Sequence, residues 1–180
     1  ESLRRLKKPR RKHAVTKPRS DSAKLGLVAE RALRGSPNGL SYFALHKLCF
    51  LAEVASLEAT GDRITNAYVV RQKDGPYFVD LHLAKLPHLV PGLQTWSERG
   101  KVFLRLQPQV DLLECEESRK LAEHHEVVIQ RVLAKYGHLP DVELKRVVYL
   151  SKYMRALLRK ERSSGANLYN AAVLPFVSQG

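Results

Sequence analysis

Residues 40–82 read LSYFALHKLCFLAEVASLEATGDRITNAYVVRQKDGPYFVDLH and contain the signals that decide the fold. Apolar residues recur every three or four positions from 40 to 59, which predicts a long helix buried on a broad face and ended by Gly61. Residues 68–70 are short and β-prone. Gly75 and Pro76 then predict a turn from this strand into a further helix, because glycine tolerates positive φ and proline suits a first helical turn.

Segments on either side of this stretch complete the expected architecture. Helical periodicity marks residues 23–34, 112–137 and 139–161. Asp21 or Ser22 is expected to cap the first of these helices, and Asp141 the last. Residues 101–107 alternate apolar and exposed positions, so they predict a strand that could pair with 68–70. We therefore expect a mainly α (α+β) fold, a compact helical domain with a small two- or three-stranded β element.

The charge of the chain is concentrated at its N-terminus. The formal net charge is +13 over 180 residues, yet residues 1–20 alone hold nine Lys or Arg residues against Glu1. Such a segment has too few apolar residues to join a core, so we expect a disordered tail at 1–20, a helical domain at 21–165 and an extension at 166–180. The candidate nucleic-acid-binding residues of the tail are Arg4, Arg5, Lys7, Lys8, Arg10, Arg11 and Lys12. A solubilising extension or a linker is the alternative interpretation of the tail.

Targeting and cysteine signals favour a cytoplasmic protein. No apolar segment follows the basic start as a secretory signal requires, and no apolar run is long enough to span a bilayer. Cys49 and Cys115 lie far apart and lack metal-site spacing, which suits a reducing compartment. The chain does not begin with Met, which leaves open a fragment or a processed chain.

The motifs of the common enzyme classes are missing from the sequence. It contains no Walker phosphate loop, Gly-rich dinucleotide fingerprint, nucleophile elbow or H-E-x-x-H zinc helix. We interpret His124, His125 and Glu126 as a solvated helix face, and Cys49 as a structural thiol. An exposed acidic first turn is the interpretation for Glu114, Glu116 and Glu117. The sequence thus predicts no catalytic residues, no cofactor and no metal, and leaves open only a site assembled from distant residues.

Three short motifs follow one another in this stretch: the helical run at 47–51 (Lys-Leu-Cys-Phe-Leu), Gly61 with Ile64-Thr65, and Gly75-Pro76. In this order they resemble the Panacea or SocA-like domain family. The similarity continues through Tyr136-Gly137 and the Leu-rich segment after it, and so covers about residues 39–158. It implies a non-enzymatic antitoxin domain of bacteria or their phages that neutralises a cognate protein toxin by direct binding. The resemblance to SocA-like members further implies a role as a proteolytic adaptor, with a protease or chaperone as a second partner.

The Gly-Pro corner is the candidate for partner recognition. Loops on rigid scaffolds often carry binding function, so this corner could hold residues 71–74 and Tyr77 outward. The candidate partner-binding residues are Arg71, Asp74, Gly75, Pro76 and Tyr77. A plain structural turn is the alternative for the corner. A nucleic-acid-binding or regulatory protein acting through the basic tail is the alternative for the whole chain.

Overall fold

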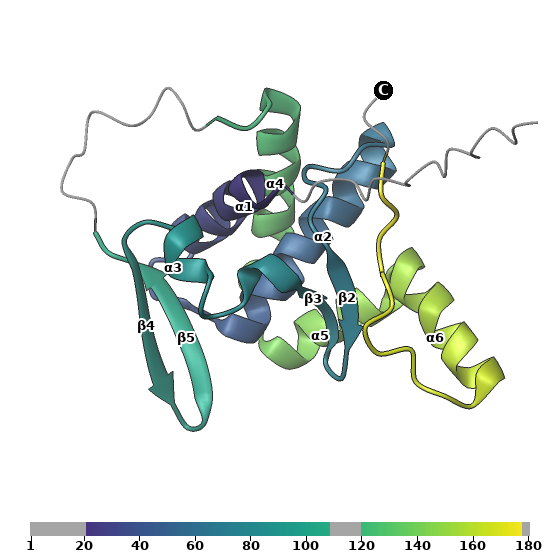
Figure 1. Cartoon of the computed structure of the whole chain (residues 1–180). Coiled ribbons are helices and arrows are strands. Elements are labelled where there is room, and N and C mark those ends of the chain that lie inside the picture. The colour runs from purple at the N-terminus through teal and green to yellow at the C-terminus, as the bar shows by residue number, and fades with distance from the viewer. Residues whose placement is uncertain (1–20, 109–119, 178–180) are drawn as a thin grey trace, which may run out of the picture.

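The computed structural model describes residues 21–108 and 120–177 (Figure 1). The α-helices among these residues are α1 (Ser22–Arg34), α2 (Tyr42–Thr60), α3 (Leu86–Leu89), α4 (Glu123–Tyr136), α5 (Asp141–Leu150) and α6 (Lys152–Ser164). The strands are β1 (Leu40–Ser41), β2 (Val69–Gln72), β3 (Gly75–Phe78), β4 (Leu93–Glu98) and β5 (Lys101–Leu106). The predicted fold class, mainly helical with a small β element, is confirmed.

Helix α2 is the centre of the core. It packs against α1, α4 and α5, and Leu45, Leu48 and Phe50 are at most 1% exposed. The helix begins at Tyr42 rather than at residue 40, because Leu40 pairs with Leu104 in a sheet and Ser41 caps the helix. The Ser41 Oγ accepts a hydrogen bond from the Ala44 N–H at 2.9 Å. A helix apolar on nearly every side is stable only when neighbours cover most of its surface, as they do between Ala44 and Val54.

Two predicted helix ends are confirmed. The Asp21 carboxylate accepts a hydrogen bond from the Lys24 N–H at 3.2 Å, so Asp21 caps α1. Gly61 ends α2 with a φ of 77°, a left-handed conformation that glycine adopts without steric cost. The predicted helix at 112–137 begins only at Glu123, because residues 120–122 are not helical and Ala122 has an extended ψ of 144°. Its predicted start, with Glu114, Cys115, Glu116 and Glu117, falls within residues 109–119, which lie outside the described part of the chain.

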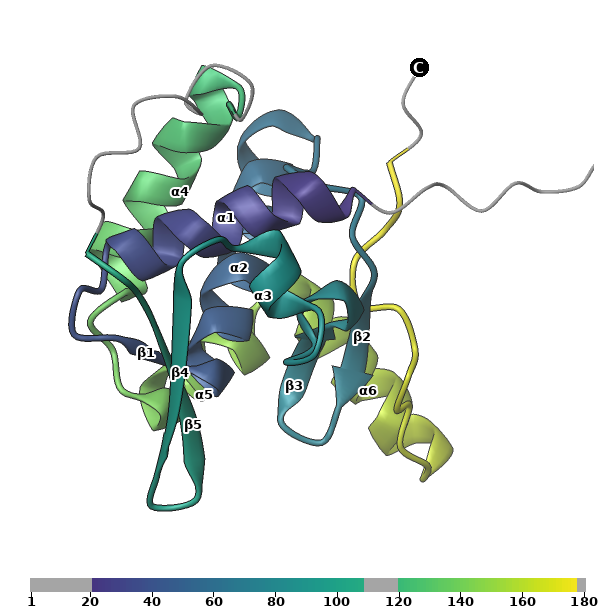
Figure 2. The same cartoon turned by 60° about the vertical axis from the view of Figure 1, so that its left-hand side comes forward.

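The strands form two separate antiparallel sheets. One has the order β1-β5-β4, and the other is the β2–β3 hairpin, in which Val70 pairs with Tyr77. The expectation that 68–70 pairs with 101–107 is therefore wrong. Each of these segments instead pairs with the strand next to it in the chain, as is usual for antiparallel hairpins. The tips of the β2–β3 and β4–β5 hairpins point to the same end of the molecule (Figures 1 and 2).

The sequence predicted that Gly75 and Pro76 lead into a helix, and this prediction is wrong. They begin β3, and a short 3-10 turn (Val79–Leu81) follows this strand. Gly75 does have positive φ, 103°, which the tight hairpin turn requires. Pro76 is tolerated because β3 is an edge strand, and its partner Arg71 directs its own N–H and C=O to the other side of β2.

The C-terminal part departs from the prediction of one helix at 139–161. Ser151 has an extended backbone (φ −62°, ψ 150°) and separates α5 from α6. Asp141 is the first residue of α5 rather than its cap, which is Pro140. This break turns Met154 and Leu157 of α6 toward the core, where both are buried. Burial of an apolar helix face thus outweighs continuity of the helix.

The segment after α6 runs back along β2. The Arg71 N–H donates to the Ala171 carbonyl at 2.9 Å, and the Arg71 carbonyl accepts from the Asn170 N–H at 2.8 Å. Val173 and Leu174 are buried. None of the described helices is both long and apolar enough to cross a membrane.

Candidate functional site

The predicted corner is a hairpin that turns most of its side chains inward. Among the proposed partner-binding residues, Asp74 is exposed, Tyr77 is half-buried, and Arg71, Gly75 and Pro76 are buried. The expectation that the corner holds Arg71 outward is therefore wrong. A strand paired on one edge by β3 and on the other by the C-terminal segment leaves alternate side chains facing the protein body.

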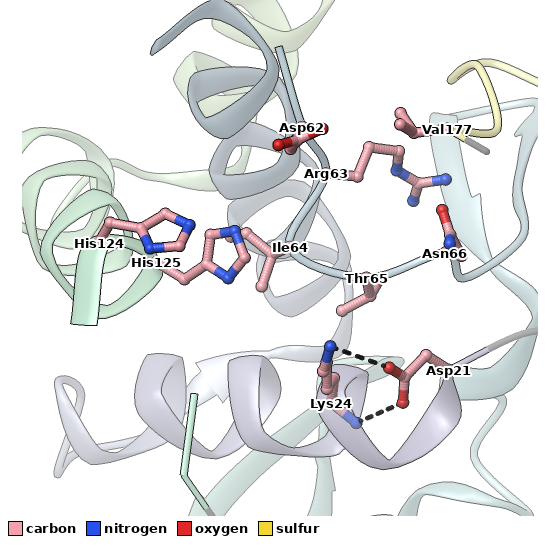
Figure 3. A pocket seen from close by; sticks show the side chains of 10 residues that line it. All are labelled: Asp21, Lys24, Asp62, Arg63, Ile64, Thr65, Asn66, His124, His125 and Val177. Atoms are coloured by element: carbon pink, nitrogen blue, oxygen red, sulfur yellow. Dashed lines mark hydrogen bonds and ion pairs between the residues drawn. The ribbon is translucent and has the colours of Figure 1, made fainter. Parts of the chain in front are cut away.

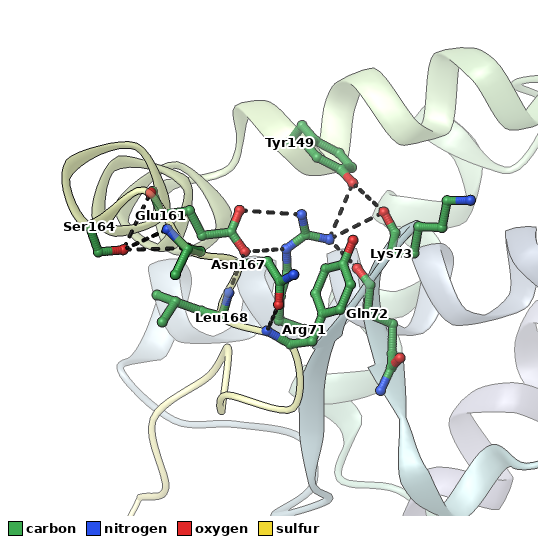
Figure 4. Close-up of polar contacts among 10 residues, drawn as sticks. Arg71, Gln72, Lys73, Tyr149, Glu161, Ser164, Asn167 and Leu168 are labelled. Carbon is green, nitrogen blue, oxygen red and sulfur yellow. Dashed lines mark hydrogen bonds and ion pairs between the residues drawn. The ribbon is translucent and has the colours of Figure 1, made fainter.

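Arg71 joins three parts of the structure (Figure 4). Its Nε lies 3.2 Å from Glu161 Oε1 in α6, and its Nη2 lies 3.4 Å from Oε2, so the contact is bidentate. Its guanidinium also donates to the Gln72 and Lys73 carbonyls and lies 5.7 Å from the ring centre of Tyr149 in α5. The side chains of Arg71 and Glu161 are only 8% and 14% exposed. Arg71 is thus a structural tie between β2, α5 and α6.

Lys47 of α2 contacts the β2–β3 hairpin at its turn. Its Nζ donates to the Pro76 carbonyl at 3.0 Å and lies 4.4 Å from the ring centre of Phe43. The side chain passes close to Gly75, where an added Cβ would lie 3.5 Å from Lys47 Cε. Lys47 is 4% exposed, and this burial lowers its pKa to about 7.

Tyr77 belongs to a half-buried aromatic cluster with His46 and Tyr42. Its ring stacks on that of His46 with centres 4.4 Å apart, and its hydroxyl lies 3.1 Å from the Tyr42 hydroxyl. His46 Nδ1 accepts from the Phe78 N–H at 3.0 Å, while its buried Nε2 has no partner among the described residues. Burial lowers the pKa of His46 to about 3, so the ring is neutral. This cluster ties β3 to α2 rather than presenting Tyr77 to solvent.

A groove of about 440 Å³ opens between the tips of the two hairpins, and we call it the hairpin groove. Its lining includes apolar side chains from three elements, namely Phe43 from α2, Val102 from β5 and Val142 from α5. Val142 is 72% exposed, although it is a branched apolar residue. Exposed apolar area bounded by polar residues is typical of sites that bind a partner.

Two ion pairs form the rim of the hairpin groove. Lys145 Nζ lies 2.9 Å from Asp74 Oδ1 at the β2–β3 tip, and Lys101 Nζ lies 3.3 Å from Asp141 Oδ2 at the β4–β5 tip. The hydrogen bond from Lys145 lowers the pKa of Asp74, and the same contact raises the pKa of Lys145. Asp74 and Lys101 are each 60% exposed, so each pair stabilises the fold by no more than about 1 kcal/mol. Asp141 is held in place, because its Oδ1 accepts a hydrogen bond from the Ser41 hydroxyl at 2.7 Å. Asp74 and Lys101 are thus the rim groups best placed to exchange partners.

A second cavity, of about 360 Å³, lies where α1, α4 and the loop after α2 meet (Figure 3). This loop is held by Glu53, whose carboxylate accepts hydrogen bonds from the Ile64 N–H at 2.9 Å and the Thr65 N–H at 3.1 Å. Arg63 lies 3.5 Å from the same carboxylate and donates to the Ala67 carbonyl at 2.9 Å. These contacts hold residues 63–65, which follow Gly61, against Glu53 of α2. The wall that this loop gives the cavity thus has a structural role.

One of the two histidines beside this cavity is less solvated than the sequence suggested: His124 is exposed, as predicted, whereas His125 is only partly exposed. The rings of His124 and His125 are 4.0 Å apart, and Figure 3 shows both entering from α4 while Arg63 points away from them. Glu126 is not a free solvated residue, because its carboxylate lies 3.0 Å from Arg31 of α1. Burial is the main cause of the lowered pKa of His125. Within residues 21–108 and 120–177, no three His, Cys, Asp or Glu side chains are placed to hold a metal ion.

Cys49 and the basic tail complete the account of the predicted residues. Cys49 is 1% exposed in α2, and its burial raises the pKa of its thiol, which disfavours the nucleophilic thiolate. The tail candidates, Arg4 to Lys12, lie outside the described residues, and their nucleic-acid role stays a prediction.

Sequence reasoning missed Val142 and Phe43. One signal could have found Val142, because it directly follows the predicted cap Asp141 and lies between two acidic residues, off the apolar stripe that Leu144 and Val148 form. Phe43 carried no such signal, since it lies within a run of apolar residues that reads as core.

A family model described as antitoxin SocA-like, Panacea domain, matches residues 45–152, which is more than half of the chain. Searches of curated proteins and of solved structures gave no match. The match confirms the family resemblance inferred from the sequence. It covers both hairpins and α5, whereas nearly all of α6 and the C-terminal segment lie beyond it.

Proposed function

This chain belongs to the family of SocA-like antitoxins with a Panacea domain, and we propose that it neutralises a cognate protein toxin by binding it directly. The family supports an antitoxin role without chemistry of its own. A cytoplasmic site of action is part of the proposal, because Cys49 is a buried free thiol of the kind that a reducing compartment preserves.

The observation that carries the proposal is the apolar lining of the hairpin groove with its exposed Val142. Protein interfaces combine an apolar centre with a polar rim, and the groove has both in one place. Val142 and Phe43 would contact an apolar anchor side chain of the toxin, while Asp74 and Lys101 would exchange their present partners for polar groups of the toxin. Of the residues predicted from sequence, Asp74 would thus contact the toxin directly.

The remaining predicted residues would act through the shape of the hairpin. Arg71 and Tyr77 fix β2 and β3 to the helices, and Lys47 fixes the turn beside Gly75. A preorganised tip binds with a smaller entropic cost than a mobile one. These residues would therefore influence the toxin complex through the rigidity of the site.

The test uses the protein encoded beside this chain in its genome, provided that this neighbour is toxic when produced alone. We expect that co-production of the chain restores growth. We also expect that Val142→Asp weakens the purified complex by about 2 kcal/mol, or roughly 30-fold, because binding would bury an unpaired carboxylate. Folding should be nearly unchanged, since a carboxylate in the first turn of α5 is favourable.

The matched control is Val127→Asp on α4, which changes a 43% exposed valine outside the groove and should bind like the parent. If Val142→Asp binds as tightly as the parent, the toxin uses another surface. If the parent does not neutralise the toxic neighbour at all, the antitoxin proposal for this pair is wrong.

A further inference from the structure

Helix α6 carries an unusual concentration of positive charge on one face. Lys152, Arg155, Arg159 and Arg162 are all exposed, and we call them the basic stripe. At 100° per residue, their spacings of three and four positions place them within about 80° of the helix circumference. Lys160 is exposed beside the stripe. The helix lies at the edge of the molecule (Figures 1 and 2).

Several exposed cations form no ion pair among the described residues, including Arg99, Arg131 and Lys135, and the stripe gathers four such cations on one helix face. Lys24, Arg34, Lys85, Lys101 and Lys145 each lie within 4.0 Å of a carboxylate. No such pair involves the stripe among the described residues.

The acidic residue of α6 is directed away from the stripe. Glu161 contacts Arg71, and its carboxylate also accepts the Leu168 N–H at 2.9 Å. Like charges three or four residues apart on a helix destabilise it by about 0.2–0.5 kcal/mol per pair. The stripe therefore carries a small cost that no ion pair within the described structure offsets. Lys152 Nζ lies 6.0 Å from the centre of the Tyr153 ring, at the outer limit of a cation–π contact.

Helix electrostatics explain only part of this pattern. Cations near the C-terminus of a helix are favourable, which accounts for Arg159 and Arg162. Lys152 and Arg155 lie in the first turn, where cations are unfavourable and where α6 has no acidic residue. The helix dipole and the nearby like charges thus both destabilise the N-terminal half of the stripe. Such a cost is expected where cations bind a ligand.

We propose that the basic stripe binds the phosphate backbone of a nucleic acid, without reading its sequence. The stripe extends about 15 Å along the helix, over which a duplex presents on the order of nine phosphate charges. A protein partner is less favoured because no large apolar residue of α6 is exposed to act as an anchor. A membrane surface is disfavoured because the apolar face of α6 is buried against the core through Met154 and Leu157.

The test compares the full-length parent with a variant in which all four stripe residues are changed to Gln. Fluorescence anisotropy with short labelled duplexes of two unrelated sequences would be measured from about 50 to about 200 mM salt. Log K falls as log salt rises, and each lost phosphate contact should make this negative slope shallower by about 1. We therefore expect the magnitude of the slope to decrease by about 3 to 4. The affinity should fall by the same factor for both duplexes.

A matched control removes the same charge elsewhere, through Arg99→Gln, Arg131→Gln, Lys135→Gln and Arg146→Gln at exposed positions outside α6, which form no ion pair among the described residues. Any binding by the basic residues 1–20 is common to all three proteins and cancels in the comparison. Equal losses in the variant and the control would overturn the proposal, as would a parent that fails to bind duplex at low salt. A stripe variant that binds duplex normally but no longer binds a protein toxin would instead assign the stripe to a protein partner, and also overturns the proposal.

Discussion

Arg71→Met should destabilise the fold strongly, although Arg71 lies in a segment that reads from sequence as an exposed loop. The substitution keeps an unbranched side chain of similar length but removes the guanidinium. Glu161 would then lose its bidentate partner while staying 14% exposed, and the Gln72 and Lys73 carbonyls would each lose a donor. The change thus leaves a nearly buried carboxylate without its counter-ion.

The expected size follows from this burial. Removing one member of a buried pair costs about 3–5 kcal/mol. Because Glu161 keeps the Leu168 N–H at 2.9 Å, we expect the lower end, about 3 kcal/mol, from the range for such pairs. In a domain of this size that corresponds to a decrease in Tm of about 6–12 °C.

Thermal and urea denaturation of both proteins would measure this loss, with Lys145→Met as the control. Lys145 forms the other ion pair of the hairpin, but it is 42% exposed and its partner Asp74 is 60% exposed. Its loss should cost no more than about 1 kcal/mol. A double-mutant cycle with Glu161→Gln should give a coupling energy of about 1–3 kcal/mol. An Arg71→Met protein that melts within about 2 °C of the parent, less than ~1 kcal/mol, would refute the reasoning.

Two further predictions concern the turn beside Arg71. Gly75→Ala should cost about 1–3 kcal/mol in urea denaturation, because the φ of 103° strains any side chain, and an unchanged midpoint would contradict this. For Lys47, burial lowers the pKa from 10.5 to about 7, so the folded state binds fewer protons than the unfolded chain between these values. The unfolding free energy of the parent should therefore rise by up to about 1.4 kcal/mol per pH unit relative to Lys47→Met, and parallel pH profiles would contradict this.

The local features of the fold could be predicted from the residues alone. The caps at Asp21 and Gly61, the burial of Leu48 and the positive φ of Gly75 depend on interactions within a few positions or on a helical period. The family resemblance also rests on short motifs in sequence order. Each of these features depends on residues within one segment, so it does not change with the place where that segment packs.

The partners of the site residues were decided only by the tertiary structure. Arg71 is buried because Glu161, ninety residues later, returns to β2 on a helix that exists as a separate element only through the break at Ser151. Val142 is 72% exposed and lines the hairpin groove beside residues of both hairpin tips, which no local pattern of α5 could show. Sequence periodicity reports which side of an element is apolar, but not which distant element reaches that side. The direction of a polar side chain on a short strand depends on that distant neighbour, because only a partner can offset the desolvation of a buried charge.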